Sequence, residues 1–263
     1  MKYVLVSGAY GGMGKAVVSK LVKVGYTVFA LDKIVEKATN QVYPLQVDVT
    51  DIESLKKAYD EISKITDNLY AIVHLAGVYY LDSLIEIPEE KFIRAFDINC
   101  FGVYRINKTF LPLLKKGSKI VITSSELAPL DPLPFTGLYA ITKSTIEKYA
   151  YSLRMELQLL GIKVSVLRPG AVKTNLLNDS VSELDKFCEK TELYQCNAVR
   201  FKKIVNSVES KNITAEKLSK KLYKIIKAKR VKFVYKINRN PLLLILNALP
   251  DRMQTWIIKK ILK

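Results

Sequence analysis

A tyrosine and a lysine four residues apart, Tyr139 and Lys143, fall on one face of a predicted helix over residues 138–160. Tyrosine is a poor base at its reference pKa of about 10, but a neighbouring ammonium favours the phenolate and lowers that pKa. Ser125, 14 residues before Tyr139, follows a predicted strand, with Ser124 as the alternative. A tyrosine activated in this way suits the exchange of a proton with a substrate.

A glycine-rich loop, residues 7–14, lies between a predicted strand over residues 3–6 and a predicted helix over residues 12–24. Glycines permit a tight turn and let the backbone approach a diphosphate, and the helix N-terminus offers unpaired N–H groups. This strand–loop–helix context favours a dinucleotide site over a flexible turn. The loop residues predicted to contact the cofactor are Ser7, Gly8, Tyr10, Gly12, Met13 and Gly14.

Asp32 ends the second predicted strand, 18 residues beyond Gly14. A carboxylate there accepts hydrogen bonds from the adenosine ribose and repels a 2′-phosphate, which favours NAD over NADP. Lys33, also predicted to contact the cofactor, and Lys37 soften that preference, so NADP remains possible.

Short apolar runs alternate with helical patterns through about residue 170. Predicted strands cover residues 3–6, 26–31, 42–47, 69–75, 119–123 and 162–167, and predicted helices cover 12–24, 52–65, 89–115 and 138–160. Most strand runs are continuously apolar, as expected when both sheet faces are covered. The pattern predicts an α/β fold, a Rossmann-type doubly wound parallel sheet with helices on both faces, in a single domain. Its strands would end along one edge, where ligands bind.

These motifs together resemble the short-chain dehydrogenase/reductase family over roughly residues 1–175. The tyrosine–lysine pair matches the family's Y-x-x-x-K, and the loop matches its G-x-x-x-G-x-G. In the family the serine typically lies 13 residues before the tyrosine, so Ser125 implies a one-residue insertion in the proline-rich loop 129–134. Asn99 matches a family asparagine that anchors a water and the lysine in a proton relay. The resemblance therefore implies Asn99, Ser125, Tyr139 and Lys143 as the catalytic residues.

The resemblance also implies further cofactor contacts. Residues 74–77 resemble the family's N-N-A-G turn, with His74 and a leucine at its first two positions. His74, the only histidine, is interpreted as a packing residue of that turn rather than a base. Residues 169–174 resemble the P-G-x-V-x-T loop that contacts the nicotinamide. The residues implied are Asp48 and Val49 at the adenine, Ala76 and Gly77 along the cofactor, and Pro169, Gly170, Val172 and Thr174 at the nicotinamide.

The implied activity is hydride exchange between a nicotinamide cofactor and an alcohol or its ketone or aldehyde, with Tyr139 as acid/base. Two alternatives remain: a dinucleotide-sensing regulator on the same fold, and a carrier-bound 3-ketoacyl reductase. Retention of the serine, tyrosine, lysine and asparagine disfavours the sensor. Asp32 disfavours the ketoacyl reductase, because that branch usually prefers NADP.

Residues 1–172 are predicted to form the cofactor-binding and catalytic core, 173–212 a substrate lid, and 213–263 a helix, a late strand at 231–235 and a basic tail. The lid residues Leu176, Leu177, Val181, Leu184 and Phe187 either face a lipophilic substrate or pack the lid onto its own domain. A steroid-, retinoid- or lipid-like substrate is expected in the first case.

The net charge of +17 is concentrated at the C-terminal end, where residues 200–263 hold 18 Lys and Arg against 3 Asp and Glu. This imbalance suggests an anionic partner or a solvated Lys-rich surface. The segment 251–262 predicts an amphipathic helix, similar to the C-termini of the hydroxysteroid and retinol dehydrogenase branch. It suits a membrane surface, a sister subunit or an acidic carrier. Nucleic acid is not expected, because no recognised nucleic-acid module accompanies the charge.

Three cysteines without a C-x-x-C fit free thiols in a reducing cytosol, and no metal site is predicted. No apolar run approaches the length of a membrane span. The expected location is therefore cytoplasmic, with membrane association left open. The family resemblance implies a homodimer or homotetramer.

Overall fold

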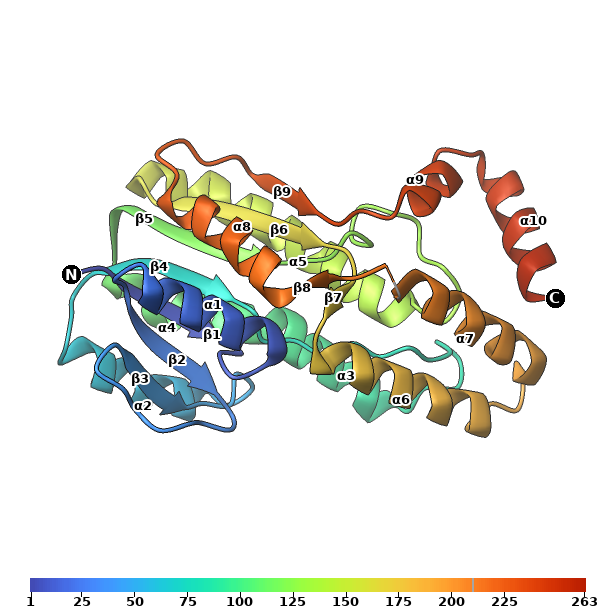
Figure 1. The fold of residues 1–263 in the computed structure, drawn as a ribbon, viewed down its shortest axis with the longest axis horizontal. Helices are drawn as coiled ribbons and strands as arrows, with labels where there is room; N and C mark the ends of the chain where they lie inside the picture. Colours follow the sequence, from blue (N-terminus) through green and yellow to red (C-terminus); the bar gives the residue numbers. More distant parts are fainter. Residues whose placement is uncertain (210) are drawn as a thin grey trace.

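The central sheet, among the residues that the structure describes, has seven parallel strands in the order β3-β2-β1-β4-β5-β6-β9 (Figure 1). The strands are β1 Tyr3–Ser7, β2 Thr27–Asp32, β3 Val42–Gln46, β4 Leu69–His74, β5 Leu114–Thr123, β6 Lys163–Pro169 and β9 Val234–Ile237. The computed structural model describes residues 1–209 and 211–263, without the side chains of residues 175–182 and 209. The strand order reverses between β1 and β4, the switch point at which such sheets bind ligands.

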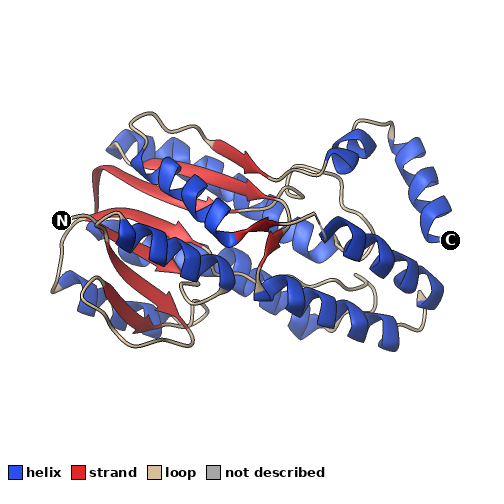
Figure 2. Ribbon diagram, in the orientation of Figure 1, coloured by secondary structure: helices blue, strands red, loops and turns tan. Residues whose placement is uncertain are grey.

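Helices cover both faces of this sheet because its strands are apolar on both sides (Figure 2). Val4, Leu5 and Val6 of β1 are all fully buried although successive side chains point to opposite faces. One face packs against α1 and α8, and the other against α2, α4 and α5. Their bounds are α1 Gly12–Lys23, α2 Ile52–Ser63, α4 Gly102–Phe110, α5 Gly137–Leu157 and α8 Ala215–Lys227. The predicted doubly wound α/β fold is confirmed.

The prediction of one continuous helix over residues 89–115 is wrong, because the helical segment is interrupted and ends earlier. The chain forms α3 (Glu89–Phe96), a π-helical turn η1 (Asp97–Phe101) and α4, then a 3₁₀ turn η2 (Leu111–Leu113). Pro112 lacks the N–H that another helical turn would need, so β5 begins at Leu114, five residues before the predicted strand. Periodicity alone does not show where an apolar run passes from helix to strand.

Apart from α8 and β9, the C-terminal third lies beyond the carboxyl ends of the strands (Figure 1). It contains β7 Val172–Lys173, α6 Asn175–Lys190, α7 Gln195–Glu209, β8 Ile213–Thr214, α9 Pro241–Asn247 and α10 Asp251–Leu262, while the 3₁₀ turn η3 (Gln158–Leu160) follows α5. Helix α10 has the predicted bounds, whereas β9 starts three residues later than predicted. Helix α9 was not predicted, although Asn240 caps it and Pro241 opens it.

Candidate active site

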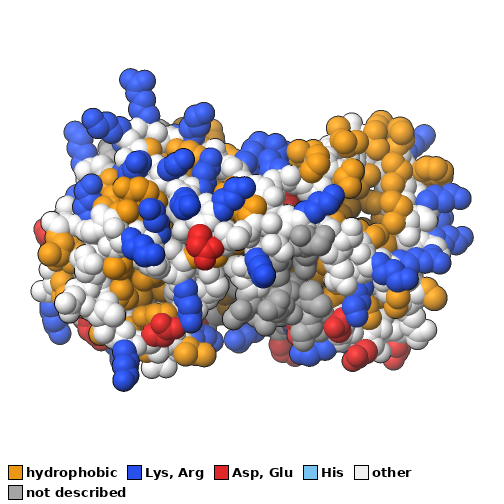
Figure 3. Space-filling view, in the orientation of Figure 1, with side chains coloured by type: hydrophobic (Ala, Val, Ile, Leu, Met, Phe, Trp, Pro, Cys, Tyr) orange, Lys and Arg blue, Asp and Glu red, His pale blue; other side chains and the backbone are white. Residues whose placement is uncertain are grey.

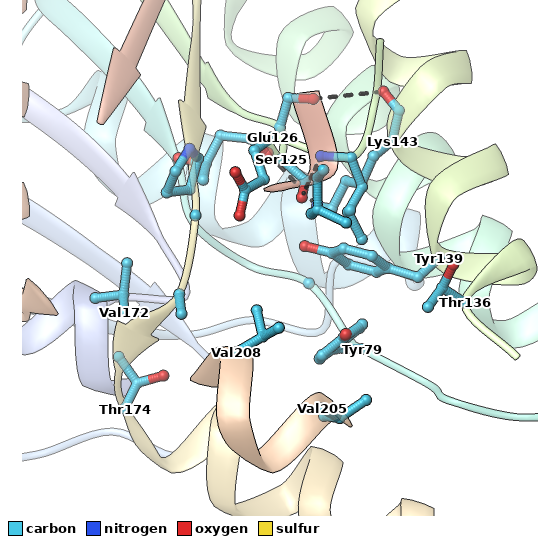
Figure 4. Close-up of a pocket in the computed structure, with 18 of the residues that line it drawn as sticks. Tyr79, Ser125, Glu126, Thr136, Tyr139, Lys143, Val172, Thr174, Val205 and Val208 are labelled. Atoms are coloured by element: carbon cyan, nitrogen blue, oxygen red, sulfur yellow. Dashed lines mark hydrogen bonds between the residues drawn. The ribbon is translucent and has the colours of Figure 1, made fainter. Parts of the chain in front are cut away.

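Helix α5 carries Tyr139 and Lys143 on one face at the carboxyl edge of the sheet, beside the end of β5 (Figure 4). The Lys143 ammonium lies 5.4 Å from the centroid of the Tyr139 ring and donates to the Thr123 carbonyl at 3.5 Å. Leu138 and Ala140 anchor this turn in the core, each only 1% exposed. The predicted pair therefore shares one cavity, held by a buried helix.

Burial, more than the neighbouring charge, sets the protonation of this pair. It raises the pKa of Tyr139 to about 12, although a hydrogen bond with Ser125 acts in the opposite direction. Burial also lowers the pKa of Lys143 to about 8. The expectation that the ammonium lowers the tyrosine pKa is thus wrong for the protein by itself, because desolvation penalises both charged forms.

Of the two candidate serines, Ser125 is the one that acts on the tyrosine, since its hydroxyl lowers the pKa of Tyr139 against the effect of burial. The Ser125 hydroxyl also accepts the Leu127 N–H at 3.2 Å. The hydroxyl of Ser124 instead donates to the Lys143 carbonyl at 3.5 Å. This geometry favours Ser125 over Ser124 as the residue nearest the reacting oxygen.

Asn99 lies in the π-helical turn η1, 1% exposed, and bridges two other segments. Its amide nitrogen donates to the Val78 carbonyl at 3.0 Å and to the Thr142 hydroxyl at 3.1 Å, and its oxygen accepts the Val78 N–H at 2.9 Å. A side chain at Gly77 would stand 3.0 Å from that oxygen and 3.5 Å from the Lys143 ammonium. Asn99 thus fixes the segment after β4 against α5.

The glycine loop packs so tightly on its neighbours that side chains are excluded. Gly8 has a φ of +68°, and a Cβ there would lie 2.5 Å from the Ala76 nitrogen. A Cβ at Gly12 would meet the Thr174 side chain at 2.7 Å, and one at Gly14 would meet the Gly8 oxygen at 2.0 Å. Helix α1 starts in this loop without a side-chain cap, which leaves its first N–H groups for a ligand.

Asp32 uses both carboxylate oxygens to hold the loop, accepting the N–H groups of Tyr10 and Lys33, each at 2.8 Å. The Lys33 ammonium pairs at 2.7 Å with Asp48. Burial opposes ionisation of Asp48, but the hydrogen bond from Lys33 leaves its pKa below the usual value. Lys33 is therefore engaged with Asp48. Lys37 is exposed and does not line the groove over the glycine loop.

Two adjoining depressions contain all but two of the predicted site residues. The groove over the loop is lined by Gly8, Tyr10, Gly12, Met13, Gly14, Asp32, Lys33, Asp48, Val49, Ala76, Gly77 and Thr174. The cavity beside it is lined by Met13, Gly77, Ser125, Tyr139, Lys143, Pro169, Gly170, Val172 and Thr174. Asn99 lies behind Gly77. Ser7, which was predicted to contact the cofactor, is fully buried at the end of β1 and lines neither depression.

His74 lies in the core, as expected for a packing residue. Its Nε2 atom is 2.9 Å from the Asn107 side-chain oxygen, and the Asn107 amide donates to the Tyr149 hydroxyl at 3.2 Å. Burial lowers the pKa of His74 to about 4, so the ring is neutral near pH 7.

The apolar wall of the cavity comes mainly from a helix that the sequence reading did not single out. Leu184 and Phe187 are fully buried in a separate cluster with Phe201 and Leu262, so they pack the lid onto its own domain. The side chains of Leu176, Leu177 and Val181 lie outside the described residues. The wall itself is formed by Phe201, Ile204, Val205 and Val208 of α7, with Leu243 of α9. The i, i+3, i+4, i+7 spacing of these four α7 residues could have shown from the sequence that they share one apolar helix face.

Three further lining residues, Tyr79, Glu126 and Thr136, were also missed. The Tyr79 ring lies 4.4 Å from the Tyr139 ring, centroid to centroid. Glu126 directly follows Ser125 and points into the cavity (Figure 4). No sequence motif marks these three positions, because only the folding of the chain brings them to the cavity.

The tail helix α10 has both buried and exposed apolar positions. Gln254 and Leu262 are buried, whereas Met253 and Trp256 are 50% and 62% exposed. Among the described residues, no helix combines the length and apolarity needed to cross a membrane.

Residues 2–185 match the family model described as short chain dehydrogenase. Estradiol 17-beta-dehydrogenase 2 of Mus musculus is 36% identical over 187 residues, 66% of this chain and 49% of the relative, so the chain spans about half that relative's length. A 3-ketodihydrosphingosine reductase of Bacteroides thetaiotaomicron is 27% identical over 263 residues, covering 97% of this chain and 96% of the relative.

Among solved structures, a short chain dehydrogenase from Burkholderia cenocepacia in complex with NADP superposes with a TM-score of 0.75 at 16% identity, covering 100% of both chains. That likeness supports the fold. The family model covers well over half of the chain. The chain therefore belongs to the short chain dehydrogenase family.

Proposed function

We propose that the protein is an NAD(P)-dependent oxidoreductase that interconverts a hydrophobic alcohol and its ketone or aldehyde. The observation that carries this proposal is the convergence of Ser125, Tyr139 and Lys143 on an apolar cavity. That cavity joins the glycine-loop groove at Met13 and Thr174. A reacting group held there would lie beside both a proton donor and the end of a bound dinucleotide.

The groove fits a dinucleotide on its own geometry. The glycine loop and the uncapped start of α1 would hold the diphosphate, Asp32 the adenosine ribose, and Asp48 and Val49 the adenine side. Tyr139 and Lys143 would hold the nicotinamide ribose. When bound, the nicotinamide supplies the hydride that is exchanged with the substrate carbon.

The chain's own residues move the proton and bind the oxygen. Ser125 donates a hydrogen bond to the substrate oxygen as negative charge develops on it. Tyr139, whose pKa burial raises to about 12, is protonated near neutrality and acts as the general acid in the reducing direction. In the oxidising direction Lys143 stabilises the phenolate electrostatically. Asn99 positions these groups through Val78 and Thr142.

For the coenzyme, the proposal favours NAD, with NADP as the alternative. Asp32 lies in the groove and carries negative charge where a 2′-phosphate would bind, while Lys33 is paired with Asp48. The ratio of the kcat/KM values for NADH and NADPH measures this preference. The substrate class follows from the apolar wall, and the similar proteins are named for estradiol and 3-ketodihydrosphingosine. We assign residues 1–172 to cofactor binding and catalysis and residues 173–212 to the substrate lid.

The decisive experiment follows NADH and NADPH absorbance at 340 nm against a panel of hydrophobic alcohols and ketones. Tyr139→Phe should lower kcat by about 1,000-fold, because the proton donor is lost. Tyr151→Phe, on an exposed turn of the same helix, is the matched control and should retain activity. Tight dinucleotide binding without turnover across the panel would instead indicate a sensor. Activity confined to acyl-carrier thioesters would indicate the 3-ketoacyl reductase.

We further propose that α9 and α10 bind an anionic membrane surface. Figure 3 shows apolar side chains gathered over these helices with Lys and Arg at their rim. Leu242, Ile245 and Trp256 are 62–65% exposed, and the same α10 segment carries Arg252, Lys259, Lys260 and Lys263. Leu243 of α9 lines the cavity, so membrane contact would place a lipid substrate near its entrance.

Trp256 is the only tryptophan and reports directly on this contact. Phosphatidylserine vesicles should blue-shift its fluorescence, and neutral vesicles should do so less. Leu242→Ser with Ile245→Ser should weaken the shift, whereas Lys57→Glu on the distant α2 should not. An unchanged spectrum with anionic vesicles would contradict the proposal.

A homodimer or homotetramer is also proposed. Three large apolar side chains are 44–54% exposed, which suits burial against a second copy: Phe101 in the turn before α4, Tyr104 in α4 and Met155 in α5. Light scattering of the purified chain measures this directly, and a monomer at micromolar concentration would contradict it.

A further inference from the structure

Glu126 places a carboxyl group in the otherwise largely apolar cavity, one residue after Ser125 (Figure 4). Its backbone N–H donates to the Pro169 carbonyl at 2.9 Å, which fixes the residue beside the end of β6. Its carboxylate atom Oε2 accepts the Asn240 N–H at 2.6 Å. The other oxygen, Oε1, lies 2.7 Å from where a Cβ of Gly170 would be, so it stands close to the backbone at that residue, whose glycine is required mainly by the Asn238 carbonyl at 1.8 Å.

This carboxylate has no cationic side chain bound to it among the described residues. The cation that contributes to its pKa is Arg239, which is exposed and acts only through its field. Burial raises the pKa of Glu126, while the Asn240 N–H and Arg239 act against that rise. A partly buried carboxylate is costly unless it is paired, so an incompletely satisfied one in a ligand cavity indicates a group supplied by the ligand.

We propose that Glu126 binds an ammonium group of the substrate, and that the substrate is a long-chain amino alcohol or the corresponding amino ketone. This assignment rests on the proposed oxidoreductase function. Because Glu126 adjoins Ser125, the ammonium would lie close to the reacting carbon. The apolar chain would extend along Val205, Val208 and Leu243.

An ammonium fits this position better than a hydroxyl. The cavity already contains the Lys143 ammonium, and the chain carries a net charge of +17. A substrate ammonium in the same cavity would therefore need an anion beside it, and the Glu126 carboxylate supplies that charge. A substrate hydroxyl would be served by a neutral acceptor without the desolvation penalty of a carboxylate.

A purely structural role is the competing explanation, since Glu126 also holds the segment before α9 through Asn240. Asp131 provides the matched control. Its carboxylate accepts the Asn247 amide at 2.5 Å and the Gln254 amide at 3.2 Å, so it holds the same C-terminal segment from outside the cavity. Glu126→Gln keeps an acceptor for the Asn240 N–H but removes the charge.

The experiment compares the oxidation, with NAD or NADP, of three alcohols that share a ten-carbon chain: 2-aminodecan-3-ol, its N-acetyl derivative and decan-3-ol. Wild type should prefer the free amine. Glu126→Gln should lower kcat/KM for the amine by about 10- to 100-fold, the worth of a charged hydrogen bond, mainly through KM. It should leave decan-3-ol nearly unchanged. Asp131→Asn should alter the three substrates in parallel, and thermal melting should show both variants folded.

The outcomes separate this assignment from the function on which it rests. If wild type oxidises decan-3-ol as well as the amine and Glu126→Gln changes neither, the ammonium assignment is wrong while the oxidoreductase function stands. If Glu126→Gln lowers kcat equally for all three alcohols, Glu126 has a general positioning role and the assignment is also wrong. If wild type oxidises none of them and reduces no ketone of the wider panel, both proposals fail.

Discussion

The dinucleotide groove and the apolar cavity meet at Met13, Gly77 and Thr174, yet they are built from different parts of the chain. Apart from Thr174, the groove is lined by residues between Gly8 and Ile98, mostly in loops that follow β1, β2, β3 and β4. The cavity draws on residues from Met13 to Leu243, and its far wall is α7 and α9.

The difference reflects what each ligand requires of the chain. The groove depends on backbone approach and on one acidic side chain, so particular residue types are needed at Gly8, Gly14 and Asp32. The cavity wall needs only apolar volume, which many side chains supply. Changes at the two regions should therefore separate coenzyme binding from substrate binding.

The largest effect is expected at Gly14 of the groove. A Cβ there would lie 2.0 Å from the Gly8 oxygen and 2.6 Å from the Ala9 carbonyl, all backbone atoms that cannot move cheaply. Gly14→Ala should lower the free energy of unfolding by about 3 kcal/mol and abolish measurable dinucleotide binding. Gly11→Ala is the control in the same loop, since its Cβ would sit 3.5 Å from the Gly8 oxygen. Urea unfolding and dinucleotide titration measure both, and equal behaviour of the two variants would contradict the packing argument.

The next largest effect is expected at His74, the last residue of β4, which leads into both the groove and the cavity. Its pKa is about 4 in the folded protein, below the ordinary value of 6.5, because of burial. Between these values the unfolded chain binds a proton that the folded chain does not, so stability should fall as pH decreases from 6.5 to 4. The loss attributable to His74 is about 3 kcal/mol. His74→Asn should show a shallower pH dependence in denaturant titrations, and an identical slope in both proteins would refute the assignment.

Asp32 tests the groove alone. Asp32→Asn should shift the ratio of kcat/KM values toward NADP by about 10-fold or more, because the repulsion of a 2′-phosphate is removed. The KM for the alcohol should stay constant. Asp67→Asn, at an exposed carboxylate, serves as the control. No change in coenzyme preference would mean that Asp32 acts only on the loop backbone through Tyr10.

The smallest effect is expected at the cavity wall. Val208→Phe should fill part of the cavity and raise the KM for long-chain substrates by about 5- to 10-fold, while short substrates and the coenzyme KM change little. Val199→Phe places the same ring on an exposed position of α7. Steady-state kinetics with alcohols of increasing length measure the difference, and equal effects from both variants would argue against Val208 as wall.

Much of the catalytic edge was predictable because its chemistry restricts residue type and spacing. The tyrosine–lysine pair and the glycine loop lie on the elements predicted for them, at the carboxyl edge of the predicted sheet. The lid residues were less predictable, because Leu184 and Phe187 look the same in sequence whether they face a substrate or their own core. Only their complete burial with Leu262 distinguishes the two.

The strand–helix alternation, the family and the polar residues of the catalytic edge can be predicted from the sequence, since each depends on a local pattern or on a residue type that the chemistry needs. The remaining features depend on how the chain folds in space. It placed Glu126 in the cavity, paired Lys33 with Asp48, and brought Val208 of α7 opposite Tyr139. It also set the pKa values of Tyr139 and Lys143, because desolvation depends on what surrounds a group in space rather than on its neighbours along the chain.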